Sequence, residues 1–134
     1  MRFVQKSGVW DVTVGGRSDT PLLTMPNITK GNTLKVTVVF LTKTAGQANS
    51  GFNYTLKTSN AADAKVLSAQ ESIVQGNAGW QTTTKTVFFE ATVHSSSGVE
   101  DVDFQIDFSA GDQDGKGQIS DFLMYAEVVS LLTP

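Results

Sequence analysis

Hydrophobic and polar residues alternate along most of this chain, and a repeat of two residues is typical of a β-strand with one buried face. The alternation is clearest over residues 33–42 and 100–108. The apolar positions expected to face the core of these strands are Leu34, Val36, Val38, Phe40, Val102, Phe104, Ile106 and Phe108. No stretch longer than a turn has the spacing of an amphipathic helix, so the pattern predicts an all-β protein.

Three further segments have less regular patterns. Residues 52–57 alternate as a half-buried strand. In residues 80–93, threonines at even positions give way to apolar residues at odd positions from Val87 onward, which predicts a switch of the buried face at a bulge. Residues 61–74 combine helix-favouring residues with an indecisive period, and we expect a loop followed by a strand.

Short strands separated by turns, with no helix between them, indicate a sandwich or barrel of antiparallel strands. Trp10 and residues 21–25 are expected to supply the first strands. A chain of 134 residues is long enough for one sizeable core and too short for two, so we expect a single domain over residues 1–134.

Charge and composition narrow the expected partners. The chain has 10 Lys and Arg residues against 13 Asp and Glu residues, and no basic cluster, so we expect neither a nucleic acid nor an anionic membrane as partner. It contains no cysteine, which excludes disulfides and thiolate chemistry. No apolar run is long enough for a signal peptide or a transmembrane segment, so neither is expected.

The residues needed for catalysis are scarce, and the sequence predicts no enzyme. His94 is the only histidine, and it lies in a serine-rich turn. In a catalytic triad the histidine and the nucleophile come from separated positions in the chain, so these neighbouring serines do not indicate a triad. An inverting glycosidase that uses Asp101, Asp103 and Asp107 is an alternative, because acids two positions apart on a strand face are separated by about 6.6 Å. A row of this kind is more often a solvated strand face.

The loop that begins at Asp112 partly fits a calcium-binding EF-hand. Lys116 and Leu123 stand where that loop needs oxygen ligands, and strand-like segments flank it instead of helices, so an EF-hand is rejected. The remaining hypothesis is a structural calcium ion in another geometry, with ligands from Asp112, Asp114 and Asp121. We expect no other cofactor.

Side chains suited to sugar binding are better represented. Aromatic faces pack against sugar rings, and amides bond to their hydroxyl groups. The candidate residues are Trp80, Tyr54, Asn53, Asn77 and Gln81. Trp80 is the strongest, because it follows a Gly- and Asn-rich turn, whereas an aromatic in register with core positions, such as Tyr54, is more often buried.

The last segment, residues 119–132, is apolar on both faces, and such a strand is usually covered on both. Outward-facing apolar residues on this segment and on residues 33–42 therefore form a candidate subunit interface. They are Val39, Leu41, Leu123, Tyr125 and Val129. Burial of these residues between copies predicts a homo-oligomer, with a trimer favoured.

The order of features resembles a carbohydrate-binding-module type of galactose-binding-like jelly roll. The matching segments, which span about residues 29–129, are TKGNTLKVTVVFLT, FNYTLK, AGWQTTTKTVFFEATV, an F-x-I-x-F strand and the closing ISDFLMYAEV, which begins I-x-D. The resemblance implies an antiparallel β-sandwich with jelly-roll topology. It also implies a calcium ion near Asp121, although Phe122 stands where the family usually repeats the aspartate.

Domains of this fold also serve as phage tail-fibre tips and capsid decorations. The Thr-, Ser-, Gly- and Asn-rich composition and the lack of cysteine fit such proteins. We therefore expect a non-enzymatic virion surface protein, made in the host cytoplasm, that binds a surface glycan. The alternatives are a purely structural capsid or assembly protein, which contacts other virion proteins, and a carbohydrate-binding module of a secreted enzyme.

Overall fold

The computed structural model describes residues 2–11, 21–44, 52–74, 79–110 and 117–129, in which all regular structure is β-strand. The strands are β1 (Arg2–Asp11), β2 (Leu23–Thr29), β3 (Thr33–Thr44), β4 (Phe52–Thr58), β5 (Ala64–Val66), β6 (Glu71–Val74), β7 (Gln81–Ala91), β8 (Val99–Ala110) and β9 (Gly117–Val128). The all-β prediction is confirmed. A membrane crossing by a long apolar helix is not found in the described part of the chain.

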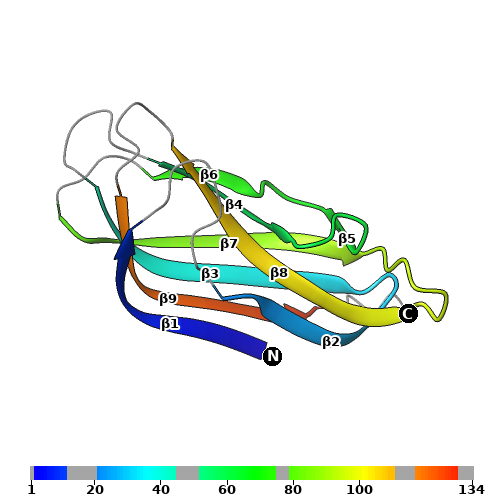
Figure 1. Ribbon diagram of the computed structural model, residues 1–134. Helices are drawn as coiled ribbons and strands as arrows, with labels where there is room; N and C mark the ends of the chain where they lie inside the picture. Colours follow the sequence, from blue (N-terminus) through cyan, green and yellow to red (C-terminus); the bar gives the residue numbers. More distant parts are fainter. Residues whose placement is uncertain (1, 12–20, 45–51, 75–78, 111–116, 130–134) are drawn as a thin grey trace.

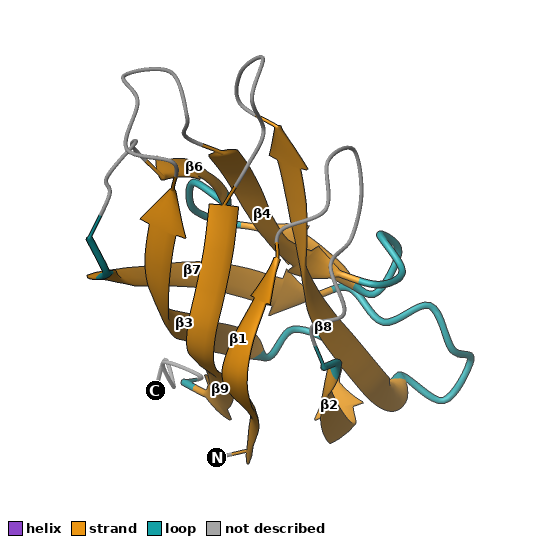
Figure 2. Ribbon diagram, turned by 60° about the vertical axis from the view of Figure 1, so that its left-hand side comes forward, coloured by secondary structure: helices purple, strands orange, loops and turns teal. Residues whose placement is uncertain are grey.

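Two antiparallel sheets pack against each other (Figures 1 and 2). One has five strands in the order β1-β9-β3-β7-β5, and the other has four in the order β2-β8-β4-β6. Every described strand lies in the opposite sheet from the strand before it, so no two consecutive strands pair. This alternation is typical of a jelly roll, and the predicted antiparallel β-sandwich is confirmed.

The core lies between the two sheets and is rich in phenylalanine. All eight residues predicted to face inward on β3 and β8 are at most 1% exposed. Phe40 on β3 meets Tyr54 on β4 edge to face, with ring centroids 5.4 Å apart, and meets Phe108 on β8 in the same way at 6.0 Å. It also stacks on Phe122 of β9 at 6.2 Å. Because each such aromatic pair adds about 0.5–1.5 kcal/mol beyond area burial, Phe40 helps to join the two sheets.

A bulge in β9 is centred on Asp121, whose φ of 54° is left-handed. Against β3, Val39 pairs with Leu123 but Leu41 pairs with Ser120, so β9 has one extra residue between these pairs. Asp tolerates a left-handed backbone better than branched residues do. The extra residue keeps Ile119 and Phe122 both in the core and leaves Asp121 exposed.

Two strand predictions need correction. The switch predicted near Val87 is wrong, because β7 pairs with β3 without a register shift and its odd-numbered residues face inward throughout. The inward Thr83 hydroxyl lies 3.3 Å from the Thr42 hydroxyl, and a hydrogen-bonded polar side chain can occupy an inward position. Residues 61–74 contain two short strands, β5 and β6, where one was expected.

Candidate functional site

The outward face of the five-stranded sheet brings together most of the predicted interface residues. Val39 on β3 lies opposite Leu123 on β9, and the next outward pair along these strands is Thr37 with Tyr125. Leu41 follows Val39 on the same side of β3. We refer to Val39, Leu41, Leu123 and Tyr125 as the outer apolar face.

Strand β1 extends this surface at the edge of the sheet. Phe3 lies opposite Tyr125 and is 63% exposed. Val129, the fifth predicted interface residue, lies just beyond β9, where its N–H donates to the Thr33 carbonyl at 2.8 Å. The second sheet packs on the opposite side, and no other described strand covers the outer apolar face.

Charged residues lie at the two ends of the outer apolar face. Lys35 and Glu127 are paired in register at one end, and Lys43 lies at the other. Between these ends the paired outward positions of the described strands are uncharged, but the exposed Asp121 lies in the bulge of β9 between the Leu123 and Ser120 rows. Thr37 is only 3% exposed, and its hydroxyl lies 3.0 Å from that of Thr86, so its polar group is satisfied within the sheet. An apolar centre with a charged rim is the usual anatomy of a protein interface.

The predicted sugar-binding residues do not form one site. Trp80 is 42% exposed at the start of β7, next to Gln81, and Lys43 Nζ lies 5.8 Å from the centre of its ring. Tyr54, by contrast, is 2% exposed and packs in the core, so it is removed from the sugar-binding set. Asn53 lies on the outward side of the other sheet, and Asn77 lies outside the described residues.

The acidic row on β8 has structural partners. Asp101 accepts a hydrogen bond from the backbone N–H of Asn27, and Asp103 accepts one from the Thr24 hydroxyl. Asp107 forms an ion pair with Lys57 at 2.8 Å. These contacts explain the acids as ties between β8 and its neighbours β2 and β4, and they weaken the glycosidase alternative.

The predicted calcium ligands are only partly described. Asp112 and Asp114 lie outside the described residues, and Asp121 occupies the exposed bulge of β9. Its left-handed backbone gives a conformational reason for this residue type that needs no metal.

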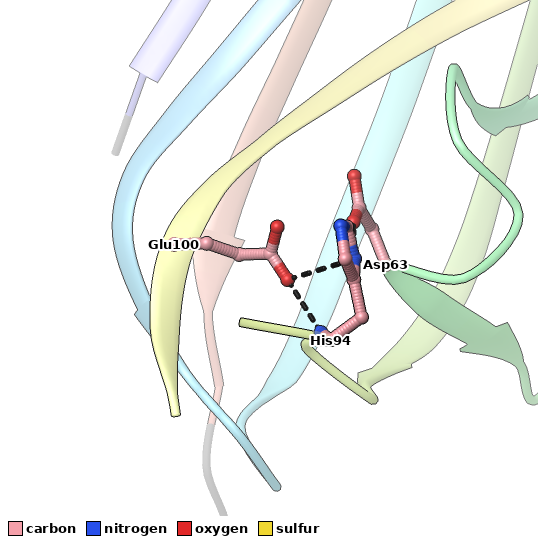
Figure 3. Close-up of side chains that lie close together, drawn as sticks. All are labelled: Asp63, His94 and Glu100. Atoms are coloured by element: carbon pink, nitrogen blue, oxygen red, sulfur yellow. Dashed lines mark hydrogen bonds and ion pairs between the residues drawn. The ribbon is translucent and has the colours of Figure 1, made fainter. Parts of the chain in front are cut away.

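A different group of ionisable side chains meets at the end of the sandwich where β8 begins (Figure 3). Asp63 lies in the turn before β5, His94 follows β7, and Glu100 is the second residue of β8. His94 Nδ1 lies 2.9 Å from Asp63 Oδ1 and 3.2 Å from Glu100 Oε1. The Glu100 carboxylate also accepts a hydrogen bond from the backbone N–H of His94 at 2.7 Å. We refer to these three residues as the end cluster.

Burial and charge within the end cluster act on Asp63. Its side chain is 9% exposed, whereas that of His94 is 52% exposed. Burial raises the pKa of Asp63, the neighbouring Glu100 carboxylate raises it further, and His94 opposes the rise. A buried carboxylate close to a second carboxylate is harder to ionise, and Asp63 is in this position.

Sequence reasoning missed the end cluster. It considered His94 as a catalytic base and found no nucleophile for it, and neither Asp63 nor Glu100 belongs to a recognisable motif. The three residues come from separate turns and a strand end, so only the crossing of the chain between the sheets brings them together. The occurrence of the only histidine six positions before a strand-opening glutamate was a weak signal.

Comparisons with known proteins give the chain no family. No family model and no curated protein matches it. Similar solved structures include a cyclase from Fischerella sp. TAU in complex with 4-(1H-indol-3-yl)butan-2-one, with a TM-score of 0.43 and 14% identity, covering 79% of this chain and 56% of that one. An apo cyclase from Fischerella sp. gives a TM-score of 0.41 and 16% identity, covering 84% and 58%. The chain thus spans little more than half of each, and the likeness is limited to a β-rich fold.

Proposed function

We propose that this chain is a non-enzymatic assembly module, a virion-type jelly roll whose copies associate through the outer apolar face. The observation that carries this proposal is that Val39, Leu41, Leu123 and Tyr125 lie side by side, each partly exposed, on a sheet face that no other described strand covers. Soluble monomers rarely expose contiguous apolar patches larger than roughly a few hundred Å² unless they bind something. Sheet faces of this kind pack onto each other at a spacing of about 10 Å, as they do inside a sandwich.

A second copy of the chain is the occupant that the charges favour. Lys35 and Glu127 lie at one end of the face and Lys43 at the other. When two copies meet with their strands running in opposite directions, Glu127 of one faces Lys43 of the other. The uncharged rows between these ends would then be buried, and the exposed Asp121 of the bulge would need a cationic partner or solvent at the interface, because an unpaired buried charge carries a large desolvation cost.

The non-enzymatic part of the proposal is supported by the contacts of the acidic side chains on β8. The acidic row on β8 is engaged in hydrogen bonds and an ion pair. A carboxylate pair for glycoside hydrolysis would need one free acid and one free base.

The test is the mass in solution of matched lysine variants on the two outward faces. Leu123→Lys places a charge at the centre of the outer apolar face, and Thr55→Lys places the same charge on the outward side of the four-stranded sheet. We expect light scattering to give a dimer mass for wild type and Thr55→Lys, and a monomer mass for Leu123→Lys. A wild-type monomer at every concentration would refute the proposal.

A glycan-binding function is a second candidate, because Trp80 remains exposed at the end of the same sheet. Gln81 follows Trp80 in the chain, and side-chain amides are a residue type that bonds to sugar hydroxyls. A glycan array probed with wild type and with Trp80→Ala tests this function. Binding that is lost in Trp80→Ala supports it, and an array without binding argues against it.

A further inference from the structure

The end cluster connects the two sheets through side chains from both of them. The chain has no cysteine, so no disulfide can connect the sheets. Asp63 and His94 adjoin strands of the five-stranded sheet, whereas Glu100 belongs to the four-stranded sheet. The Asp63 carbonyl accepts hydrogen bonds from the N–H groups of Thr92 at 2.9 Å and Val93 at 3.2 Å. The backbone therefore fixes the turn of Asp63 against the turn of His94.

The Asp63 carboxylate has an unmet bonding requirement. Its Oδ1 atom is buried and receives no hydrogen bond from the described residues. His94 Nδ1 is at ion-pair distance, 2.9 Å, but without the alignment of an N–H···O hydrogen bond. A buried carboxylate oxygen without a donor destabilises the fold, so the site needs either a proton or a cation.

We propose that Asp63, His94 and Glu100 bind a divalent transition-metal cation of the zinc class. The ligand atoms offered by the three residues lie within 4.8 Å of one another. Zinc takes imidazole nitrogen and carboxylate oxygen at about 2.0–2.2 Å in a tetrahedron, so these donors need only small side-chain shifts to surround it. The half-exposed His94 leaves one side open to solvent, where water would occupy the fourth position.

The donor set favours zinc over the alkaline-earth cations. Calcium takes six to eight oxygen ligands, and magnesium requires an octahedron of oxygens. The end cluster offers one nitrogen and two carboxylates, which suits zinc and its first-row neighbours. The cation would neutralise the two carboxylates that otherwise repel each other, and its binding would hold the two sheets together at this end.

The single histidine makes a direct test possible, because the imidazole signals of the ¹⁵N-labelled protein all come from His94. Zinc chloride is titrated into metal-free protein at neutral pH, and the ring nitrogens are followed by NMR. We expect saturation at one zinc per chain, with the larger shift on Nδ1. Calcium and magnesium at the same concentrations should leave the ring unchanged.

Variants and thermal melting complete the test. Asp63→Asn and Glu100→Gln each remove a ligand, and Asp101→Asn is the matched control, because its side chain bonds to Asn27 outside the cluster. Zinc at about 100 times its dissociation constant should raise the Tm of wild type and control by about 10 °C. Each ligand variant should bind zinc at least about tenfold more weakly.

Two outcomes would overturn the proposal. One is a wild-type protein whose His94 signals and Tm do not respond to zinc. The other is a zinc response that survives unchanged in Asp63→Asn and Glu100→Gln, which would mean that His94 binds the metal as an isolated surface imidazole. If a variant fails to fold, the first outcome can still overturn the proposal, because it needs only the wild-type titration.

Discussion

At the scale of single residues, the most unusual side chain in the described structure is Asp63. It is 9% exposed, lies against a second carboxylate, and has an oxygen without a hydrogen bond. These features raise its pKa above the ordinary value of 3.8. The ionised form of Asp63 therefore destabilises the fold at neutral pH. A proton, the neighbouring His94 or a metal ion would reduce this destabilisation.

The sign of this effect gives a prediction for the metal-free protein. Because the folded-state pKa of Asp63 is raised, its protonation stabilises the fold fully below pH 3.8, and this stability is lost as the pH rises through the folded pKa. Asp63→Asn cannot ionise and should not lose it. We expect the unfolding free energy of wild type, relative to Asp63→Asn, to fall as the pH rises from about 4 to 7.

Urea unfolding of both proteins in the presence of a chelator measures this difference. Titrating groups that do not contact Asp63 contribute equally to the two proteins and cancel, so the difference reports on the end cluster as a whole. Parallel pH profiles for wild type and Asp63→Asn would show that the carboxylate is not perturbed by its surroundings.

At the same scale, the sequence predicts burial correctly where the alternation within one strand is enough to decide which side chains face the core. Phe40 and Phe104 were placed correctly because alternation alone decides which side of a strand is buried. It was less successful for Tyr54, which offered two readings, core and sugar-binding, and which the structure places in the core. The end cluster could not be predicted, since its members meet only through the packing of different sheets.

At the scale of elements, the bulge in β9 is a device that sets the register of the five-stranded sheet. One extra residue at Asp121 lets Ile119 and Phe122 both face the core. The left-handed φ at this position would strain a branched residue by about 1–2 kcal/mol. Local sequence did not reveal the bulge, because the alternation on either side of it looks regular.

The bulge predicts an order of stability at position 121. Asp121→Gly should unfold within about 0.5 kcal/mol of wild type, because glycine adopts left-handed conformations freely. Asp121→Val should lose about 1–2 kcal/mol. Urea denaturation measures both values.

A calcium site that includes Asp121 predicts a different result. Calcium would then raise the Tm of wild type, and Asp121→Gly would lose that rise. If the Tm of wild type is the same in calcium and in chelator, the backbone account of Asp121 stands alone.

At the scale of the whole molecule, the main feature is that the chain crosses from one sheet to the other after each described strand. Because no two consecutive described strands pair, every strand contact in the described sheets joins segments that are distant in sequence. In such topologies the chain loses the entropy of closing long loops before the strand pairs can stabilise it. Most of the strands could be predicted from the alternation of the sequence. Their order within the sheets depends on long-range contacts, and only the resemblance to jelly-roll domains gave an expectation for it.

This topology predicts slow folding. We expect refolding in about milliseconds to seconds, in the range of other all-β sandwiches. Stopped-flow tryptophan fluorescence after dilution from urea would follow it. Refolding in microseconds would contradict a fold built from non-local pairs.

The central claim is that another copy of the chain covers the outer apolar face. Because the chain has no cysteine, a single cysteine introduced by Val39→Cys reports on that face alone, and Thr55→Cys reports on the opposite face. The most direct measurement is the rate of thiol labelling of the two variants as the protein concentration rises. We expect the rate at position 39 to fall severalfold while that at position 55 stays constant. Equal, concentration-independent rates at both positions would contradict the claim.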